Sequence, residues 1–175
     1  MAAGPIQIEV APLTAEGFAP FGTVVLHSGT ARRHYVPRAF ERTDEAGQPT
    51  LWVSQVAAAV TLPLIVRHLE RHPFSAQTFL PLRGVEHLAV VCHSDPEGRP
   101  DLGTLRAFLV PQDHGVTYGR DVWHHGFTAL DQPAEYAVVM SLTGRNDDDV
   151  FLDLDRPVEI RSPAPAVVGA SHVQP

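Results

Sequence analysis

The stretch LERHPFSAQTFLPLRG, residues 69–84, joins polar side chains to an apolar run. Glu70 and His72 alternate with Arg71, so on a β-strand they point to the same face. Gln77 stands at the start of the apolar run that follows. The interior of a β-barrel is normally apolar, because an unpaired polar group is costly to bury. A carboxylate, an imidazole and an amide on one such face therefore indicate a metal ion or a polar ligand.

A second interpretation of this stretch is a strand at the edge of a sheet, whose polar face is simply solvated. Residues 69–84 alone do not decide between the two. If a metal binds, the combination of imidazole nitrogen, carboxylate oxygen and amide oxygen suits a borderline divalent ion such as Ni, Zn, Mn or Fe. His68 is in phase with Glu70 and His72 and is a further candidate ligand.

Outward from this stretch, the chain consists of short apolar or alternating runs separated by proline and glycine. Many short strands at this spacing predict an all-β, closed barrel or sandwich. The expected strands are IQIEV (6–10), GTVVLH (22–27), TLWVSQVA (50–57), LIVRHLERH (64–72), AQTFLPL (76–82), HLAVVC (87–92), TLRAFLV (104–110), HHGFTAL (124–130), EYAVVMSL (135–142) and VFLDL (150–154). A short helix is expected within residues 12–22, with Thr14 as its N-cap.

The chain of 175 residues is long enough for one domain with a real core, which we place at residues 1–161. The proline-rich segment 162–175 is expected to be a mobile tail. A net charge of -7 argues against nucleic acid or an anionic membrane as partner. No apolar run approaches the roughly 20 residues of a membrane span, and the first residues do not resemble a signal peptide. The single cysteine, Cys92, lies in an apolar run, which predicts an inert buried thiol in a cytoplasmic protein.

All 13 basic residues are arginine, and this excludes two kinds of chemistry. Schiff-base catalysis and a Walker-type phosphate loop both require a lysine. Arginine remains available, and its planar guanidinium suits bidentate capture of a carboxylate.

A second polar stretch is HGVTYGRDVWHHGF, residues 114–127. Its glycines predict turns, and the apolar pair before His124 predicts a short buried segment. Adjacent histidines on a strand face opposite ways, so at most one of His124 and His125 joins the first group. We expect Tyr118 and Trp123 to be core or rim aromatics.

Together the two stretches resemble the motifs of the cupin superfamily. Glu70, His72, Gln77 and Gly84 are separated by one, four and six residues, as in the first cupin motif. Glu70 stands there in place of a histidine, and Gln77 in place of a glutamate. His124 resembles the histidine of the second motif. The resemblance implies a cupin-like, jelly-roll type β-barrel with one or two short helices, and a site made of Glu70, His72, Gln77 and His124.

A narrower resemblance covers residues 62–130. The patterns E-R-H-P-x3-Q-x-F-x-P-L, P-D-x-x-T-L-R-A-F and G-V-x-Y-x-R-x-V-W-H-H are similar to those of the ureidoglycolate lyase family, formerly called ureidoglycolate hydrolase. The resemblance implies a homodimeric enzyme that splits (S)-ureidoglycolate into glyoxylate and urea during allantoin and purine degradation. The chain differs from the family pattern between residues 27 and 50, where His27 replaces an asparagine while Gly29 and Arg33 can still be matched.

The chemistry implied by the resemblance assigns roles to five residues. Glu70, His72, Gln77 and His124 would hold a divalent metal, Gln77 and Arg33 would bind substrate, and Glu70 or His124 would act as general base. The alternative is a non-catalytic or differently specific cupin that binds another small hydroxy or keto acid, and a cupin oxygenase or isomerase is a third class. The acidic run in GRNDDDV, residues 144–150, lacks the spacing of a calcium loop and is expected to be a solvated turn.

Overall fold

The computed structural model describes residues 4–83 and 85–163, and consists almost entirely of β-strands. Gly84 and most of the tail expected at 162–175 lie outside the described residues. The first of two sheets has the strand order β10 (Thr128–Ala129), β6 (His87–Cys92), β7 (Arg106–Val110), β1 (Ile6–Pro12), β12 (Val150–Arg161), β4 (Leu64–Arg71) and β9 (Trp123–His124). The second has the order β2 (Gly22–Val25), β8 (Gly115–Tyr118), β5 (Gln77–Pro81), β11 (Ala134–Leu142) and β3 (Gln48–Val56).

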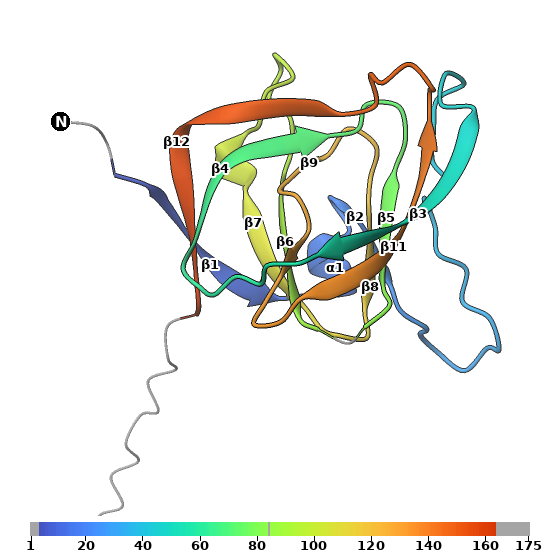
Figure 1. The fold of residues 1–175 in the computed structure, drawn as a ribbon, viewed down its shortest axis with the longest axis horizontal. Helices are drawn as coiled ribbons and strands as arrows, with labels where there is room; N and C mark the ends of the chain where they lie inside the picture. The colour runs from blue at the N-terminus through green and yellow to red at the C-terminus, as the bar shows by residue number, and fades with distance from the viewer. Residues whose placement is uncertain (1–3, 84, 164–175) are drawn as a thin grey trace, which may run out of the picture.

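The first sheet closes on itself. β9 pairs with both β4 and β6, and this joins β6, β7, β1, β12, β4 and β9 into a ring (Figure 1). The structure therefore confirms the predicted all-β barrel. β1 pairs in parallel with both β12 and β7, so the barrel is mixed rather than purely antiparallel.

β6 is buried on both faces because it lies between two apolar cores. Leu88, Val90 and Cys92 pack inside the ring, whereas Ala89 and Val91 pack against the second sheet. A strand of this kind reads as a continuous apolar run, which is why HLAVVC was recognisable in the sequence. Cys92 is buried as expected, and burial raises the pKa of its thiol to about 12.

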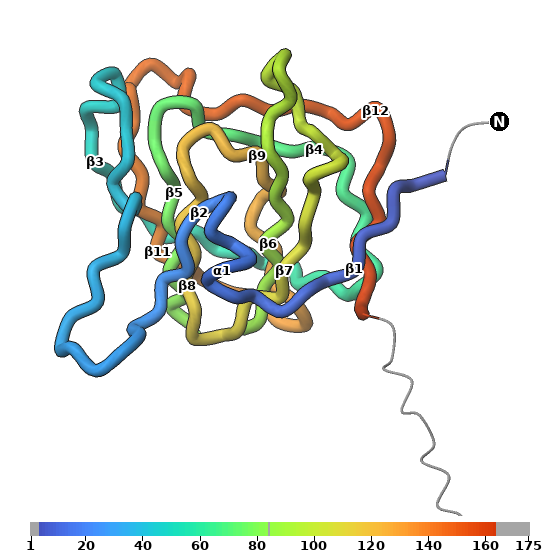
Figure 2. Tube along the Cα trace, turned by 180° about the vertical axis from the view of Figure 1, so that it is seen from behind, coloured from blue at the N-terminus to red at the C-terminus, as the bar shows by residue number. Residues whose placement is uncertain are grey.

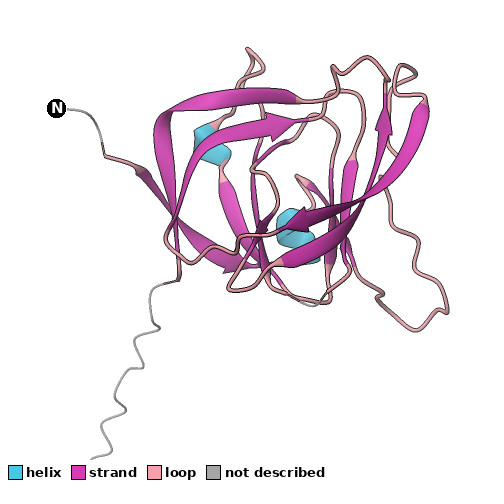
Figure 3. Ribbon diagram, in the orientation of Figure 1, coloured by secondary structure: helices cyan, strands magenta, loops and turns pink. Residues whose placement is uncertain are grey.

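The helices are as short as expected (Figure 3). Helix α1 covers Ala15–Phe18, and its predicted N-cap is confirmed, because the Thr14 hydroxyl accepts a hydrogen bond from the Gly17 amide. A 3-10 helix covers Leu102–Thr104. Among the described residues, no helix has the length and apolar character to cross a membrane.

One strand was missed from the sequence, and another was predicted only in part. Gly115–Tyr118 forms β8 where turns were expected, and Trp123–His124 forms β9, which overlaps the start of the strand expected at residues 124–130. The loop between β2 and β3 extends away from both sheets (Figure 2). It carries the segment that departs from the family pattern.

Candidate active site

Glu70, His72 and His124 converge where β4 meets β9. Glu70 and His124 are direct cross-strand partners, and the Asp121 amide donates to the His72 carbonyl at 2.9 Å. One ligand atom from each of the three side chains lies within 4.8 Å of the other two. Glu70 Oε1 lies 3.6 Å from His124 Nε2. The two polar stretches of the sequence therefore meet in one cluster.

Neighbouring contacts hold the segment that leads to His124. Arg71 forms an ion pair with Asp121 at 2.8 Å, and its guanidinium carbon lies 5.0 Å from the centre of the Trp123 ring. These contacts tie the end of β4 to the start of β9. They fix the backbone positions from which the cluster residues project.

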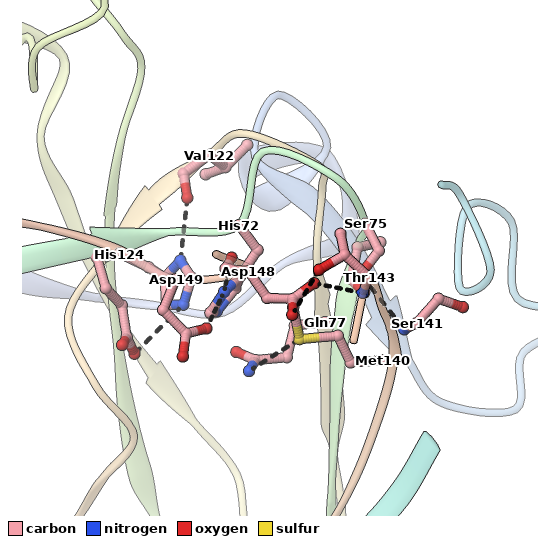
Figure 4. A network of polar contacts seen from close by, with 12 residues as sticks. His72, Ser75, Gln77, Val122, His124, Met140, Ser141, Thr143, Asp148 and Asp149 are labelled. Carbon is pink, nitrogen blue, oxygen red and sulfur yellow. Dashed lines mark hydrogen bonds and ion pairs between the residues drawn. The ribbon is translucent and has the colours of Figure 1, made fainter. Parts of the chain in front are cut away.

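Both imidazoles leave the same ring nitrogen without a protein partner. His124 Nδ1 donates to the Val122 carbonyl at 3.0 Å, and His72 Nδ1 donates to the Asp149 carboxylate at 2.9 Å (Figure 4). Carbonyl and carboxylate oxygens only accept, so each Nδ1 carries the proton. The Nε2 atoms of His72 and His124 are buried and have no hydrogen-bond partner. The arrangement presents two imidazole nitrogens to one small space.

Gln77 and Tyr118 add two more unpartnered polar atoms. The Gln77 amide nitrogen contacts Met140 Sδ at 3.7 Å, which leaves its buried Oε1 free. Tyr118 is the cross-strand partner of Gln77, and its ring stacks on His124 with centroids 4.3 Å apart. The buried Tyr118 hydroxyl also has no partner among the described residues. Such atoms are rare in protein interiors and mark places where a ligand can bind.

The surroundings shift the pKa values of these groups in different directions. Burial raises the pKa of Glu70, and the positive charge of His72 offsets this only in part. Burial lowers the pKa of His124 to about 3, so this imidazole is neutral at pH 7. Burial also acts to lower the pKa of His72, but its hydrogen bond to Asp149 and the charge of Glu70 outweigh it and leave the pKa raised. Burial raises the pKa of Tyr118, which keeps the phenol protonated.

These residues fit a divalent metal ion. Ligand atoms about 2 Å from a shared ion lie some 3 to 3.5 Å apart, and the separation of 3.6 Å between Glu70 and His124 is close to this. The free Nε2 atoms and the Gln77 Oε1 are of the imidazole and amide types that were expected as ligands, and they would be available to such an ion. The Glu70 carboxylate supplies a negative charge that a cation would neutralise.

Three other candidates stand apart from the cluster. His68 is exposed, and its ring lies 5.8 Å from that of His125. His68 shares a face of β4 with Glu70, as expected, because the pairing of β4 with β12 is regular from His68 to Arg71, and the register shift lies before His68. Arg33 is exposed on the β2–β3 loop and is not among the charges that act on Glu70.

Residues 144–147 of the run GRNDDDV are exposed, as expected of a solvated turn, but Asp148 and Asp149 depart from that expectation. Asp149 accepts the hydrogen bond of His72, and the Asp148 carbonyl oxygen lies 3.3 Å from the same nitrogen. The Asp148 side chain is buried. Nothing in the local pattern marks this contact, since it joins residues far apart in the chain. The only signal of this contact in the sequence is the unusual density of carboxylates in the run.

Comparison with known proteins agrees with this geometry. A family model described as Ureidoglycolate lyase matches residues 5–160. The chain belongs to the ureidoglycolate lyase family. The resemblance inferred from residues 62–130 is thereby confirmed and extends over nearly the whole described chain.

Several curated members of the ureidoglycolate lyase family are similar over most of their length. A putative ureidoglycolate lyase of Agrobacterium fabrum is 41% identical over 149 residues, covering 85% of this chain and 91% of that protein. The ureidoglycolate lyase of Stutzerimonas stutzeri is 36% identical, with 85% and 92% covered. That of Rhizobium etli is 34% identical, with 92% and 99% covered. Among solved structures, RmlC from Streptococcus suis in complex with dTDP-D-xylose aligns with a TM-score of 0.43 at 14% identity, covering 79% of this chain and 72% of that one.

Proposed function

We propose that this protein is a ureidoglycolate lyase that cleaves (S)-ureidoglycolate into glyoxylate and urea. The observation that carries the proposal is the cluster of Glu70, His72 and His124, whose ligand atoms converge within 4.8 Å in a chain of this family. The unpartnered atoms of Gln77 and Tyr118 beside it provide further contacts for a small polar substrate.

The reaction is an elimination. One carbon of ureidoglycolate carries a hydroxyl, a carboxylate and the ureido nitrogen. The hydroxyl loses its proton and becomes the carbonyl of glyoxylate, while the carbon–nitrogen bond breaks and the departing nitrogen gains a proton. No water is consumed, so urea rather than ammonia is released.

We assign Glu70, His72, Gln77 and His124 to a divalent metal ion, either Ni, Zn, Mn or Fe. When bound, such an ion would polarise the substrate's hydroxyl and lower its pKa. His124 is neutral and offers Nε2 directly. The carboxylate of Glu70 has two oxygens, so one can face the ion while the other accepts the hydroxyl proton. Its burial raises its pKa toward the range that suits a general base.

Arg33 remains a prediction as a substrate-binding residue. It lies exposed on the β2–β3 loop, and a role in gripping the substrate carboxylate requires that loop to approach the cluster. Of the two candidates for substrate binding, the proposal therefore relies mainly on Gln77.

We also propose that the protein is a cytoplasmic homodimer. β3 is the outer strand of the second sheet, and its Leu51 and Val53 are 65% and 58% exposed. Tyr35 and Phe40 on the β2–β3 loop are exposed as well. An open sheet edge bearing apolar side chains is usually covered by a partner. The unpaired Cys92 is compatible with a reducing compartment.

The test is the product balance from racemic ureidoglycolate, with urea, glyoxylate and ammonia measured with and without a chelator. Equal amounts of urea and glyoxylate, no ammonia, and loss of turnover with chelator are expected. Ammonia in place of urea would show hydrolysis and contradict the elimination. Absence of turnover would favour a cupin specific for another small hydroxy or keto acid, since residues 27–50 differ from the family pattern.

A further inference from the structure

Asp149 contacts His72, and its charge also acts on Glu70 and His124. Its Oδ1 is 2.9 Å from His72 Nδ1 (Figure 4). The His72 side chain is 4% exposed, whereas that of Asp149 is 54% exposed. The carboxylate thus reaches from the surface to a buried imidazole that the sequence placed in the site.

The contact determines which nitrogen of His72 faces the cluster. A carboxylate can only accept, so Nδ1 keeps its proton, and in the neutral ring Nε2 is the nitrogen that presents a lone pair. Nε2 is the buried atom without a partner. His124 reaches the same state through the Val122 carbonyl, a backbone group. For His72 the corresponding acceptors are the Asp149 side chain and the Asp148 carbonyl.

The loop that carries Asp149 is fixed by its neighbours. The Asp148 carboxylate accepts from the Thr143 amide at 2.8 Å and lies 3.2 Å from the Thr143 hydroxyl. Asp147 instead contacts the Thr143 hydroxyl and Arg145. Asp147 and Asp148 both contact Thr143, and of the three adjacent aspartates only Asp149 places its carboxylate on the imidazole.

We propose that Asp149 is a positioning residue that holds His72 with Nε2 directed into the cluster, and so sets the affinity of the site for a divalent metal ion. The inference rests on the proposed metal site and adds a residue to it. Second-layer carboxylates of this kind fix the tautomer and ring orientation of a metal-binding histidine, and their loss typically weakens metal binding 10- to 100-fold.

The experiment compares wild type with Asp149→Ala, Asp149→Asn and the matched control Asp147→Asn. Calorimetric titration with Ni, Zn and Mn salts measures metal affinity on the whole chain. Asp149→Ala should bind roughly 10- to 100-fold more weakly, and Asp147→Asn should bind as wild type does. Asp149→Asn keeps an acceptor oxygen but no charge. Its metal affinity, compared with those of wild type and Asp149→Ala, therefore separates the effect of the hydrogen bond from that of the charge. Thermal unfolding of each variant checks that it is folded.

A second readout is the tautomer of His72, taken from the ring 15N shifts. In wild type the proton should be on Nδ1, and in Asp149→Ala the Nε2–H form should appear. Unchanged affinity and tautomer in Asp149→Ala would overturn the inference, as would a wild type that binds none of these metals. Neither readout uses ureidoglycolate. If wild type binds metal and Asp149→Ala weakens it, the inference holds even where lyase activity is absent and the proposed function fails.

Discussion

Glu70 and His124 are cross-strand partners, and Oε1 of Glu70 lies 3.6 Å from Nε2 of His124. This distance is too long for a strong hydrogen bond. The two groups are held together by backbone pairing rather than by their own attraction. Such an arrangement leaves both atoms available to a third group. Substitution of Glu70 is therefore the most direct test of the site.

Glu70→Gln should lower turnover at least about 100-fold, because a neutral amide cannot accept the hydroxyl proton. The change preserves the shape of the side chain, so the fold should survive. Steady-state kinetics on ureidoglycolate gives the measurement, and exposed Glu86 offers a matched control in Glu86→Gln. Equal turnover in Glu70→Gln and wild type would remove Glu70 from the mechanism.

Tyr118→Phe should stabilise the protein while it slows the reaction. The Tyr118 hydroxyl is buried without a partner, and such a group costs about 1 kcal/mol or more in the ligand-free protein. Denaturant unfolding should show that gain, and kinetics should show a loss of turnover. The control is Tyr136→Phe, which also removes a buried unpartnered hydroxyl but from a ring packed on Phe127. A variant of Tyr118 that keeps full activity would show that its hydroxyl has no part in the site.

The sequence predicts the barrel and the first polar group because both depend on local pattern. Alternation places Glu70 and His72 on the same face, and the apolar run in β6 indicates a strand that is buried on both faces. The same alternation puts His68 on the face of Glu70, and the regular pairing of β4 with β12 from His68 to Arg71 keeps it there. Alternation gives the face but not how far the site extends along the strand, and the His68 side chain is exposed.

Contacts between distant segments account for the rest of what was missed. Asp149 meets His72 only because β12 begins beside the end of β4, where Val150 pairs with Arg71. Tyr118 meets His124 because β8 and β9 belong to different sheets that face one another. An acidic run and a tyrosine between glycines are common in solvated turns, so their local sequence favours the ordinary interpretation.

Val53→Glu should convert the proposed dimer to a monomer. Val53 lies on the outer strand β3 and is 58% exposed, so a carboxylate there would be buried without a partner in an interface. Light scattering after gel filtration should then give a mass near the 19.0 kDa of one chain. Phe151→Glu is the control, because Phe151 is equally exposed but lies on β12 of the other sheet. A wild type that already has the mass of one chain would contradict the dimer.

His87 should make the folded protein sensitive to acid. It is fully buried at the start of β6, with its ring 4.2 Å from that of Phe127, and burial lowers its pKa to about 3. The unfolded chain has the ordinary value near 6.5. Between these values the unfolded state binds more protons, so stability is full above about pH 6.5 and falls as the pH drops.

The contribution can be isolated by comparing free energies of unfolding at pH 7.5 and pH 5. At pH 5 the single buried histidine should cost about 2 kcal/mol, at about 1.4 kcal/mol for each pH unit below its unfolded value. Between the two pH values, the free energy of unfolding of His87→Leu should fall by about 2 kcal/mol less than that of wild type. The variant His34→Leu, at an exposed position, should lose as much as wild type. If His87→Leu shows the full acid loss, the sensitivity belongs to other groups and the His87 ring is able to take up a proton in place.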